Sequence, residues 1–157
     1  MSAQLETSPR FRRMAESDLD AVMAIENVIY THPWTRGNFA DSLAAHSHCH
    51  VMEWYGVMVG YAVLMTAADE AHLLNLSIAA AWQRRGLGRE LLNYLIGFAR
   101  ELKVQKIFLE VRASNTTARA LYANSRFREI GVRRGYYPAH AGREDAIVLE
   151  CVLGYAK

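Results

Sequence analysis

Cysteine, proline and long apolar runs are scarce in this chain of 157 residues, which holds 2 Cys and 3 Pro. Cys49 and Cys151 lie far apart and form no C-x-x-C pair, so a disulfide scaffold is excluded and a reduced, cytoplasmic setting is expected. Residues 1–13 carry no apolar segment typical of a secretory signal. The longest uncharged run, residues 54–68, is shorter than the roughly 20 residues of a membrane-spanning helix. A membrane partner is therefore not expected.

A strong charge of one sign is also missing. The chain has 18 Lys and Arg against 16 Asp and Glu, a net charge of +2, and 52% of its residues are hydrophobic. This composition excludes disorder. A nucleic-acid partner, which a basic stripe would indicate, is not expected. The length predicts a single domain over residues 1–157 with its core at about residues 10–153, and we expect a monomer.

The spacing of apolar residues predicts the secondary structure. Helical spacing favours four helices, at residues 18–30, 35–45, 87–102 and 115–124. Short apolar runs favour seven strands, at residues 11–14, 50–54, 57–66, 72–79, 106–111, 127–132 and 146–153. The Tyr-Tyr-Pro segment at residues 136–138 is predicted to be a loop between the last two strands. The order of elements predicts an α/β fold with a mixed sheet and helices on both faces.

Residues 83–89 read Q-R-R-G-L-G-R and lie between a predicted strand and a long helix. Backbone N–H groups at a helix start favour an anion, and glycines let a phosphate approach them closely, so the loop can hold a pyrophosphate. A Walker loop would need Lys-Ser or Lys-Thr after the glycines, and neither follows. A dinucleotide fingerprint would need a third glycine where Leu91 stands. Both of these nucleotide functions are disfavoured.

This loop resembles the pyrophosphate loop of the GCN5-related N-acetyltransferases (GNAT), and three further segments are similar to that family in the same order. They are L-L-N-L-S-I at 73–78, L-E-V-R-A-S-N with A-L-Y at 109–122, and R-R-G-Y-Y-P with G-R-E-D-A-I at 133–147. The last segment narrows the resemblance to bacterial ribosomal-protein-alanine N-acetyltransferases of the RimI type. The resemblance implies the acyl-CoA N-acyltransferase fold, a mostly antiparallel central sheet with a splayed strand pair.

The implied reaction transfers acetyl from acetyl-CoA, with no metal, to the N-terminal alanine of the eighteenth small-subunit ribosomal protein. Such a transfer needs a base for the amine, since an α-amine with a pKa of about 7.7–8.0 is mostly charged at neutral pH. The resemblance assigns Glu110 as general base and Tyr122 as general acid for the departing thiolate. The alternatives are a solvent-facing strand glutamate and a tyrosine that belongs to the core.

The resemblance also implies which residues hold the cofactor. These are the backbone of Leu76, Ser77 and Ile78, the loop residues Arg84, Arg85, Gly86, Leu87, Gly88 and Arg89, and Asn115. Asn115 could instead cap its own helix. Neither cysteine falls in these segments, so direct attack by the amine is favoured over an acyl-enzyme.

The acceptor side is predicted to involve Trp34, Tyr136, Tyr137 and Asp145. The two tyrosines could instead pack around Trp34. Glu144 and Asp145 could attract a cationic N-terminus, or they could pair with Arg133 or Arg134. His46, His48, His50 and Cys49 have the residue types of a zinc site, but no carboxylate or second cysteine accompanies them, so zinc is disfavoured.

Two alternative functions stay open. One is the same chemistry on another N-terminus, a lysine or a small amine. The other is a catalytically silent acyl-CoA-binding module, which would keep the arginine loop but would not need Glu110 or Tyr122. The chain departs from the family at Ser125-Arg126, where Leu-Gly is common. A positive φ at Arg126 would cost roughly 1 kcal/mol.

Overall fold

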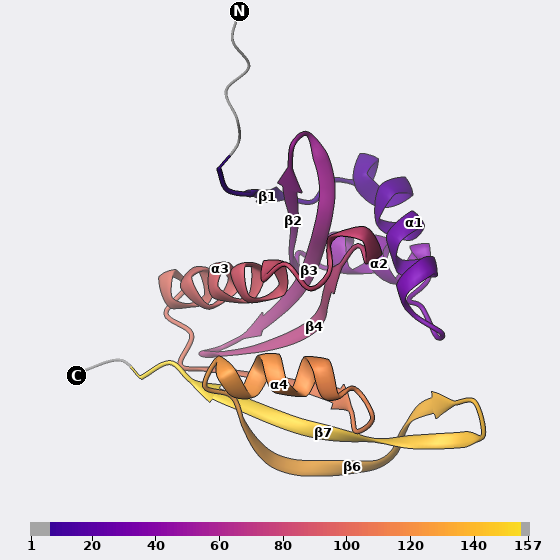
Figure 1. The fold of residues 1–157 in the computed structure, drawn as a ribbon. Helices are drawn as coiled ribbons and strands as arrows, with labels where there is room; N and C mark the ends of the chain where they lie inside the picture. The colour runs from indigo at the N-terminus through magenta and orange to yellow at the C-terminus, as the bar shows by residue number, and fades with distance from the viewer. Residues whose placement is uncertain (1–6, 155–157) are drawn as a thin grey trace, which may run out of the picture. The chain divides into compact units, whose positions relative to one another are not determined.

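A computed structural model describes residues 7–154 of the chain (Figure 1). Its helices and strands follow the predicted order, with two short 3-10 turns added at Glu16–Asp18 and Ala80–Trp82. The α-helices are α1 (Leu19–Ile29), α2 (Arg36–Ala44), α3 (Leu87–Glu101) and α4 (Thr116–Asn124). The strands are β1 (Arg10–Arg13), β2 (His48–Trp54), β3 (Val57–Ala67), β4 (Glu70–Ile78), β5 (Lys106–Arg112), β6 (Arg128–Ala139) and β7 (Gly142–Val152). No helix within residues 7–154 is long and apolar enough to span a membrane.

The seven strands form a sheet in the order β1-β2-β3-β4-β5-β7-β6. Strand β1 pairs antiparallel with β2, as β7 does with both β5 and β6, whereas β4 and β5 are parallel. The mixed sheet of the predicted fold class is therefore confirmed. The parallel ladder covers three residue pairs, from Glu70↔Lys106 to His72↔Phe108. The splayed geometry expected at Leu76–Ile78 stays a prediction.

The chain divides into two compact units, and each is described by itself. The first unit comprises residues 1–63 and 75–91, and the second comprises residues 64–74 and 92–157. Strands β3 and β4 and helix α3 each supply residues to both units. The single domain expected from the length stays a prediction.

The core of the first unit forms where α1 and α2 bury their apolar faces. Helix α2 begins after Thr35, whose hydroxyl accepts a hydrogen bond from the Asn38 N–H at 3.1 Å, the N-cap that this residue type favours. Phe39 is fully buried, and its ring contacts those of Trp34 and Tyr61 at centroid distances of 5.0 and 5.7 Å. This aromatic cluster fixes the segment between α1 and α2, which includes Trp34.

The core of the second unit combines the apolar stripe of α3 with alternate residues of β5. Ile107, Leu109 and Val111 are buried, while the intervening residues Phe108 and Glu110 point to the other face of the strand. Glu110 thus shares a strand face with Phe108. The structure also gives Arg126 a φ of 69°. This positive φ is the left-handed conformation that the sequence analysis considered for Arg126, and it carries an energetic penalty in a residue other than glycine.

The predicted loop at residues 136–138 is wrong, because β6 continues through it to Ala139. Tyr137 pairs with Glu144 and Pro138 with Arg143, after an irregular register between Arg133 and Tyr137. Strand β6 ends the strand order, so the N–H that Pro138 lacks is not needed by a further strand. Strands β6 and β7 therefore form one long hairpin (Figure 1) that carries the tyrosine pair.

Candidate active site

The glycine loop opens α3 within the first unit. Arg84 has a φ of 64° and Gly86 a φ of 80°, so the backbone turns left-handed at two positions directly before the helix. Leu87, the first residue of α3, is buried and anchors the loop, and Gly88 lies in the same turn. The three arginine side chains are exposed; they are Arg84, Arg85 and Arg89. Exposed guanidinium groups around a helix start favour a pyrophosphate.

The end of β4, also in the first unit, is held by side-chain hydrogen bonds. The Tyr30 hydroxyl contacts Ser77 Oγ at 2.6 Å and donates to the Leu76 carbonyl at 3.3 Å. Ser77 Oγ donates to Asn75 Oδ1 at 2.6 Å, and Ile78 is almost fully buried. Burial raises the pKa of Tyr30 to about 12, which keeps its proton for these contacts. The cofactor contacts predicted for Leu76, Ser77 and Ile78 stay a prediction about their backbone.

Glu110 belongs to the second unit, and its side chain is 7% exposed. Its Oε2 contacts His72 Nε2 at 2.5 Å, and its Oε1 contacts Arg133 Nε at 3.3 Å. Burial, and then the charge of the nearby Glu110, raises the pKa of the Tyr137 hydroxyl to about 12. The solvent-facing alternative for Glu110 is therefore wrong, and its base role stays a prediction.

The two α4 residues that the sequence singled out have separate surroundings. Asn115 is the N-cap, and its Oδ1 accepts a hydrogen bond from the Ala118 N–H at 3.1 Å. Tyr122 is 7% exposed, and its ring meets that of Phe127 edge-on at 5.5 Å. Both alternative roles, helix cap and core tyrosine, are thus realised. The cofactor contact of Asn115 and the acid role of Tyr122 stay predictions.

The tyrosine pair in the β6–β7 hairpin presents one exposed ring and one half-buried ring. Tyr136 is 45% exposed, and its ring meets that of Tyr137 edge-on at 4.9 Å. The Arg112 guanidinium lies 4.6 Å over Tyr137, and that of Arg133 lies 5.7 Å from Tyr136. Two cation–π contacts therefore fix the rings as a wall on this part of the second unit.

The hairpin acids are engaged by partners that the sequence did not indicate. Glu144 accepts hydrogen bonds from the Ser114 N–H at 2.8 Å and from Arg112 at 3.2 Å. These donors, Ser114 first, hold the pKa of Glu144 below its usual range. Asp145 Oδ1 accepts a hydrogen bond from the Gly135 N–H at 2.9 Å. The alternative in which Glu144 pairs with Arg133 or Arg134 is wrong, because its ion-pair partner is Arg112.

A buried carboxylate in the first unit was missed by the sequence reasoning. Glu26 is 1% exposed and accepts hydrogen bonds from the Tyr61 hydroxyl at 2.6 Å and from the Trp34 N–H at 2.8 Å. Burial, then the Glu26 contact, raises the pKa of Tyr61, so its proton stays in place. Glu26 lies on the buried face of α1 with Leu19 and Val22, and this spacing was the available signal. Its donors keep the Trp34 segment in place.

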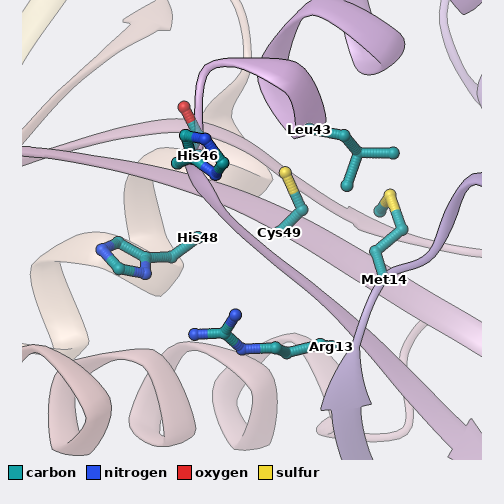
Figure 2. A pocket seen from close by; sticks show the side chains of 7 residues that line it. Arg13, Met14, Leu43, His46, His48 and Cys49 are labelled. Atoms are coloured by element: carbon teal, nitrogen blue, oxygen red, sulfur yellow. The ribbon is translucent and has the colours of Figure 1, made fainter.

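The histidine-rich segment that the sequence offered as a zinc alternative lines a pocket of about 370 Å³ in the first unit (Figure 2). The sulfur atoms of Met14 and Cys49 lie near Leu43, away from the Arg13 and His48 side chains. Burial raises the pKa of Cys49 to about 11, which disfavours the thiolate that zinc would need. No group of three or more His, Cys, Asp or Glu in the described part of the chain is placed to hold a metal ion.

The second unit thus gathers the groups that a proton transfer requires. A nearly buried carboxylate lies beside a histidine, an arginine and an aromatic wall, so it can accept a proton from an amine that approaches it. The sequence reasoning did not identify His72 as a member of this group, nor Arg112, which lies over the ring of Tyr137.

Comparison with known proteins gives matches in both sequence and structure. A sequence model described as "Acetyltransferase (GNAT) family" matches residues 19–126. The [Ribosomal protein bS18]-alanine N-acetyltransferase of Escherichia coli is 39% identical over 133 residues, which cover 85% of this chain and 90% of that protein. The protein of the same name from Haemophilus influenzae is 35% identical over 137 residues, 87% of this chain and 93% of that protein.

Among solved structures, the ribosomal-protein-S18-alanine N-acetyltransferase from Escherichia coli matches with a TM-score of 0.89 and 36% sequence identity. The match covers 95% of this chain and 96% of that one. The similarity to this structure therefore extends over nearly the whole chain, in both fold and sequence.

Proposed function

The chain belongs to the acetyltransferase (GNAT) family, and from this premise we propose that it acetylates the N-terminal alanine of ribosomal protein bS18, with acetyl-CoA as the donor. The observation that carries the proposal is the Glu110 carboxylate, which is nearly buried, held at both oxygens and flanked by the tyrosine wall. The relatives whose names state this acceptor are similar to the chain over most of their length. As one acetyltransferase domain modifying a ribosomal protein, the enzyme would work in the cytoplasm.

The arginine loop would hold the pyrophosphate of acetyl-CoA. The N–H groups at the start of α3 and the exposed guanidinium groups of Arg84, Arg85 and Arg89 supply both donors and charge. The backbone of Leu76, Ser77 and Ile78, with Asn115, would contact the rest of the donor. No metal is needed for this binding.

Glu110 would remove the proton that an N-terminal ammonium carries at neutral pH, and the freed amine would attack the thioester carbonyl directly. The C–S bond breaks as the amide forms, and Tyr122 would give its proton to the departing thiolate. The second proton that the nitrogen loses as the amide forms would return Tyr122 to its neutral form. Both cysteines are buried, and burial raises the pKa of each thiol, which supports direct transfer over an acyl-enzyme. Tyr136 and Tyr137, with Trp34 and Asp145, would bind the first residues of the acceptor.

The test of the acceptor is acetyl-CoA turnover on peptides that begin with the bS18 sequence. Matched peptides with a blocked N-terminus and one internal lysine, and free polyamines, serve as competing acceptors. We expect acetylation of the free α-amine to be the fastest by at least tenfold. Faster acetylation of the blocked, lysine-bearing peptide would overturn the N-terminal assignment, and binding of acetyl-CoA without turnover on any acceptor would indicate a silent module.

The acid role is tested by Tyr122→Phe, which keeps the ring against Phe127. We expect turnover to fall by about 10²–10⁴-fold with the melting temperature nearly unchanged. Normal turnover in this variant would leave Tyr122 as a core residue only.

A further inference from the structure

His72 is the nearest titratable partner of the proposed base, and no part of the proposed function uses it. Its Nε2 lies 2.5 Å from Glu110 Oε2, and its side chain is 18% exposed against 7% for Glu110. When Nε2 carries the ring proton, the imidazole N–H donates a hydrogen bond to the carboxylate oxygen at this contact. The contact joins β4 to β5 inside the second unit.

The sheet register brings these two side chains together. His72 pairs with Phe108 across the parallel ladder, and Glu110 follows Phe108 by two residues on the same strand face. The imidazole stacks on the Phe108 ring with centroids 4.6 Å apart and an interplanar angle of 23°. The stacked ring fixes the direction in which Nε2 points, and that direction is toward Glu110.

Arg133 holds the other oxygen of the same carboxylate. Its Nε lies 3.3 Å from Glu110 Oε1, and its guanidinium also lies near Tyr136. A carboxylate with a partner at each oxygen cannot rotate freely, because rotation would break both the hydrogen bond to His72 and the ion pair with Arg133. The lone pairs of the Glu110 oxygens that are not used by His72 or Arg133 therefore point in a fixed direction.

We propose that His72 is a positioning residue for acetyl transfer, which holds Glu110 Oε2 through its Nε2–H so that the carboxylate faces the incoming amine. The inference rests on the proposed function, since it takes Glu110 as the base. His72 itself forms no bond with the acceptor and takes no part in the transfer of the acetyl group. What it supplies is an oriented base, and misplacement of a reacting group by about 1 Å can cost roughly 10²-fold in rate.

Two variants separate donation from bulk. His72→Phe keeps an aromatic ring to stack on Phe108 but removes the donor, whereas His72→Gln places an amide N–H at the reach of Nε2. We expect His72→Phe to lower kcat by roughly 10- to 100-fold with the KM for acetyl-CoA unchanged, and His72→Gln to restore kcat to within about threefold of wild type. His140→Gln, at an exposed histidine of the hairpin, is the matched control and should leave kcat unchanged.

A double-variant cycle with Glu110→Gln tests whether His72 acts through the base. In the Glu110→Gln background we expect His72→Phe to cause no further loss, because the two residues form one unit. Normal kcat in His72→Phe, an equally slow His72→Gln, or an undiminished loss in the double variant would each overturn the positioning role. If His72→Phe melts below the assay temperature, His72→Asn, whose shorter amide cannot reach Glu110, takes its place.

The cycle also separates failure of this inference from failure of the proposed function. A wild-type rate in Glu110→Gln refutes the base assignment itself. A slow Glu110→Gln together with a normal His72→Phe refutes only the role of His72.

Discussion

Glu26 in the first unit is buried, the side chain of Glu110 in the second unit is nearly buried, and the two carboxylates differ in what holds them. Glu26 in the first unit is 1% exposed, and its donors are a tyrosine hydroxyl, a backbone N–H and the more distant amide of Asn75. Glu110 in the second unit is held by a histidine and an arginine. The donors of Glu26 are neutral groups, whereas Glu110 has an imidazole at one oxygen and a guanidinium at the other.

This difference indicates that the Glu26 carboxylate serves the stability of the fold and that the Glu110 carboxylate serves the reaction. Glu26 lies in a fixed network that ties α1, β3 and the Trp34 segment together, so its removal should be felt in folding. Glu110 lies beside the tyrosine wall, with one exposed ring, and beside His72, so its removal should be felt in turnover.

The largest effect is expected for Glu110→Gln. Loss of the proposed base should lower turnover by about 10²–10⁴-fold, while the amide keeps the volume of the side chain. The measurement is steady-state acetylation of the bS18 peptide, with urea unfolding as the control for folding. A loss of stability as large as that of Glu26 variants would erase the contrast between the two residues.

The next effect is expected for Glu26→Ala. The change leaves the Tyr61 hydroxyl and the Trp34 N–H without their acceptor and opens a cavity, so the free energy of unfolding should fall by about 3 kcal/mol. Urea denaturation measures it, and Glu26→Gln, which keeps one acceptor oxygen, should lose less. A wild-type denaturation midpoint in Glu26→Ala would contradict a structural role for this carboxylate.

We expect His50, in the first unit, to make the stability of the protein depend on pH. Burial, with smaller effects from His48 and Arg13, lowers the pKa of His50 to about 4, against about 6.5 in an unfolded chain. Between these values the unfolded state binds the extra proton, so stability is lost as the pH falls from about 6.5 to 4, on the order of 2 kcal/mol. His50→Gln should flatten this part of the unfolding curve measured against pH.

The control for this measurement is His140→Gln, which removes an exposed histidine of the hairpin. It should leave the slope between pH 6.5 and 4 as in wild type. An unchanged slope in His50→Gln would mean that another group causes the loss of stability in acid. It would contradict the assignment of this pH dependence to the first unit.

The smallest effect is expected for Arg126→Gly, which tests backbone strain without touching either glutamate. Arg126 follows α4 with a φ of 69°, a conformation that glycine adopts without penalty. The free energy of unfolding should rise by about 0.5–1 kcal/mol, and turnover should stay as in wild type. Thermal melting measures the gain, and a lower melting temperature would show that the arginine side chain contributes more than its backbone costs.

The order of helices and strands could be predicted because most elements repeat buried positions at a regular spacing. Strand β5 alternates buried and part-exposed residues, and α3 shows a clear apolar stripe. The second half of β6 could not be predicted in this way, because all of β6 is exposed or half-buried and its Pro138 is typical of a loop. Only its pairing with β7 makes that segment a strand.

The candidate site could be predicted where it lies in continuous motifs and not where it depends on register. Glu110 and Tyr122 belong to segments that resemble the family, so both were identified. His72 lies 38 residues before Glu110, and only the β4–β5 ladder brings them together. The partner of Glu144 was missed for the same reason, since Arg112 competes with nearer arginines that the sequence made more obvious.

The exposed strand β6 also bears on how the protein behaves at high concentration. It ends the strand order, and a bare edge strand with exposed Ile130, Val132 and Tyr136 would invite a second sheet to add to it. Pro138 removes one donor from this edge, the irregular register at Arg133–Tyr137 bends it, and neighbouring arginines give it charge. The features that shape the tyrosine wall therefore also protect the chain from edge-to-edge aggregation.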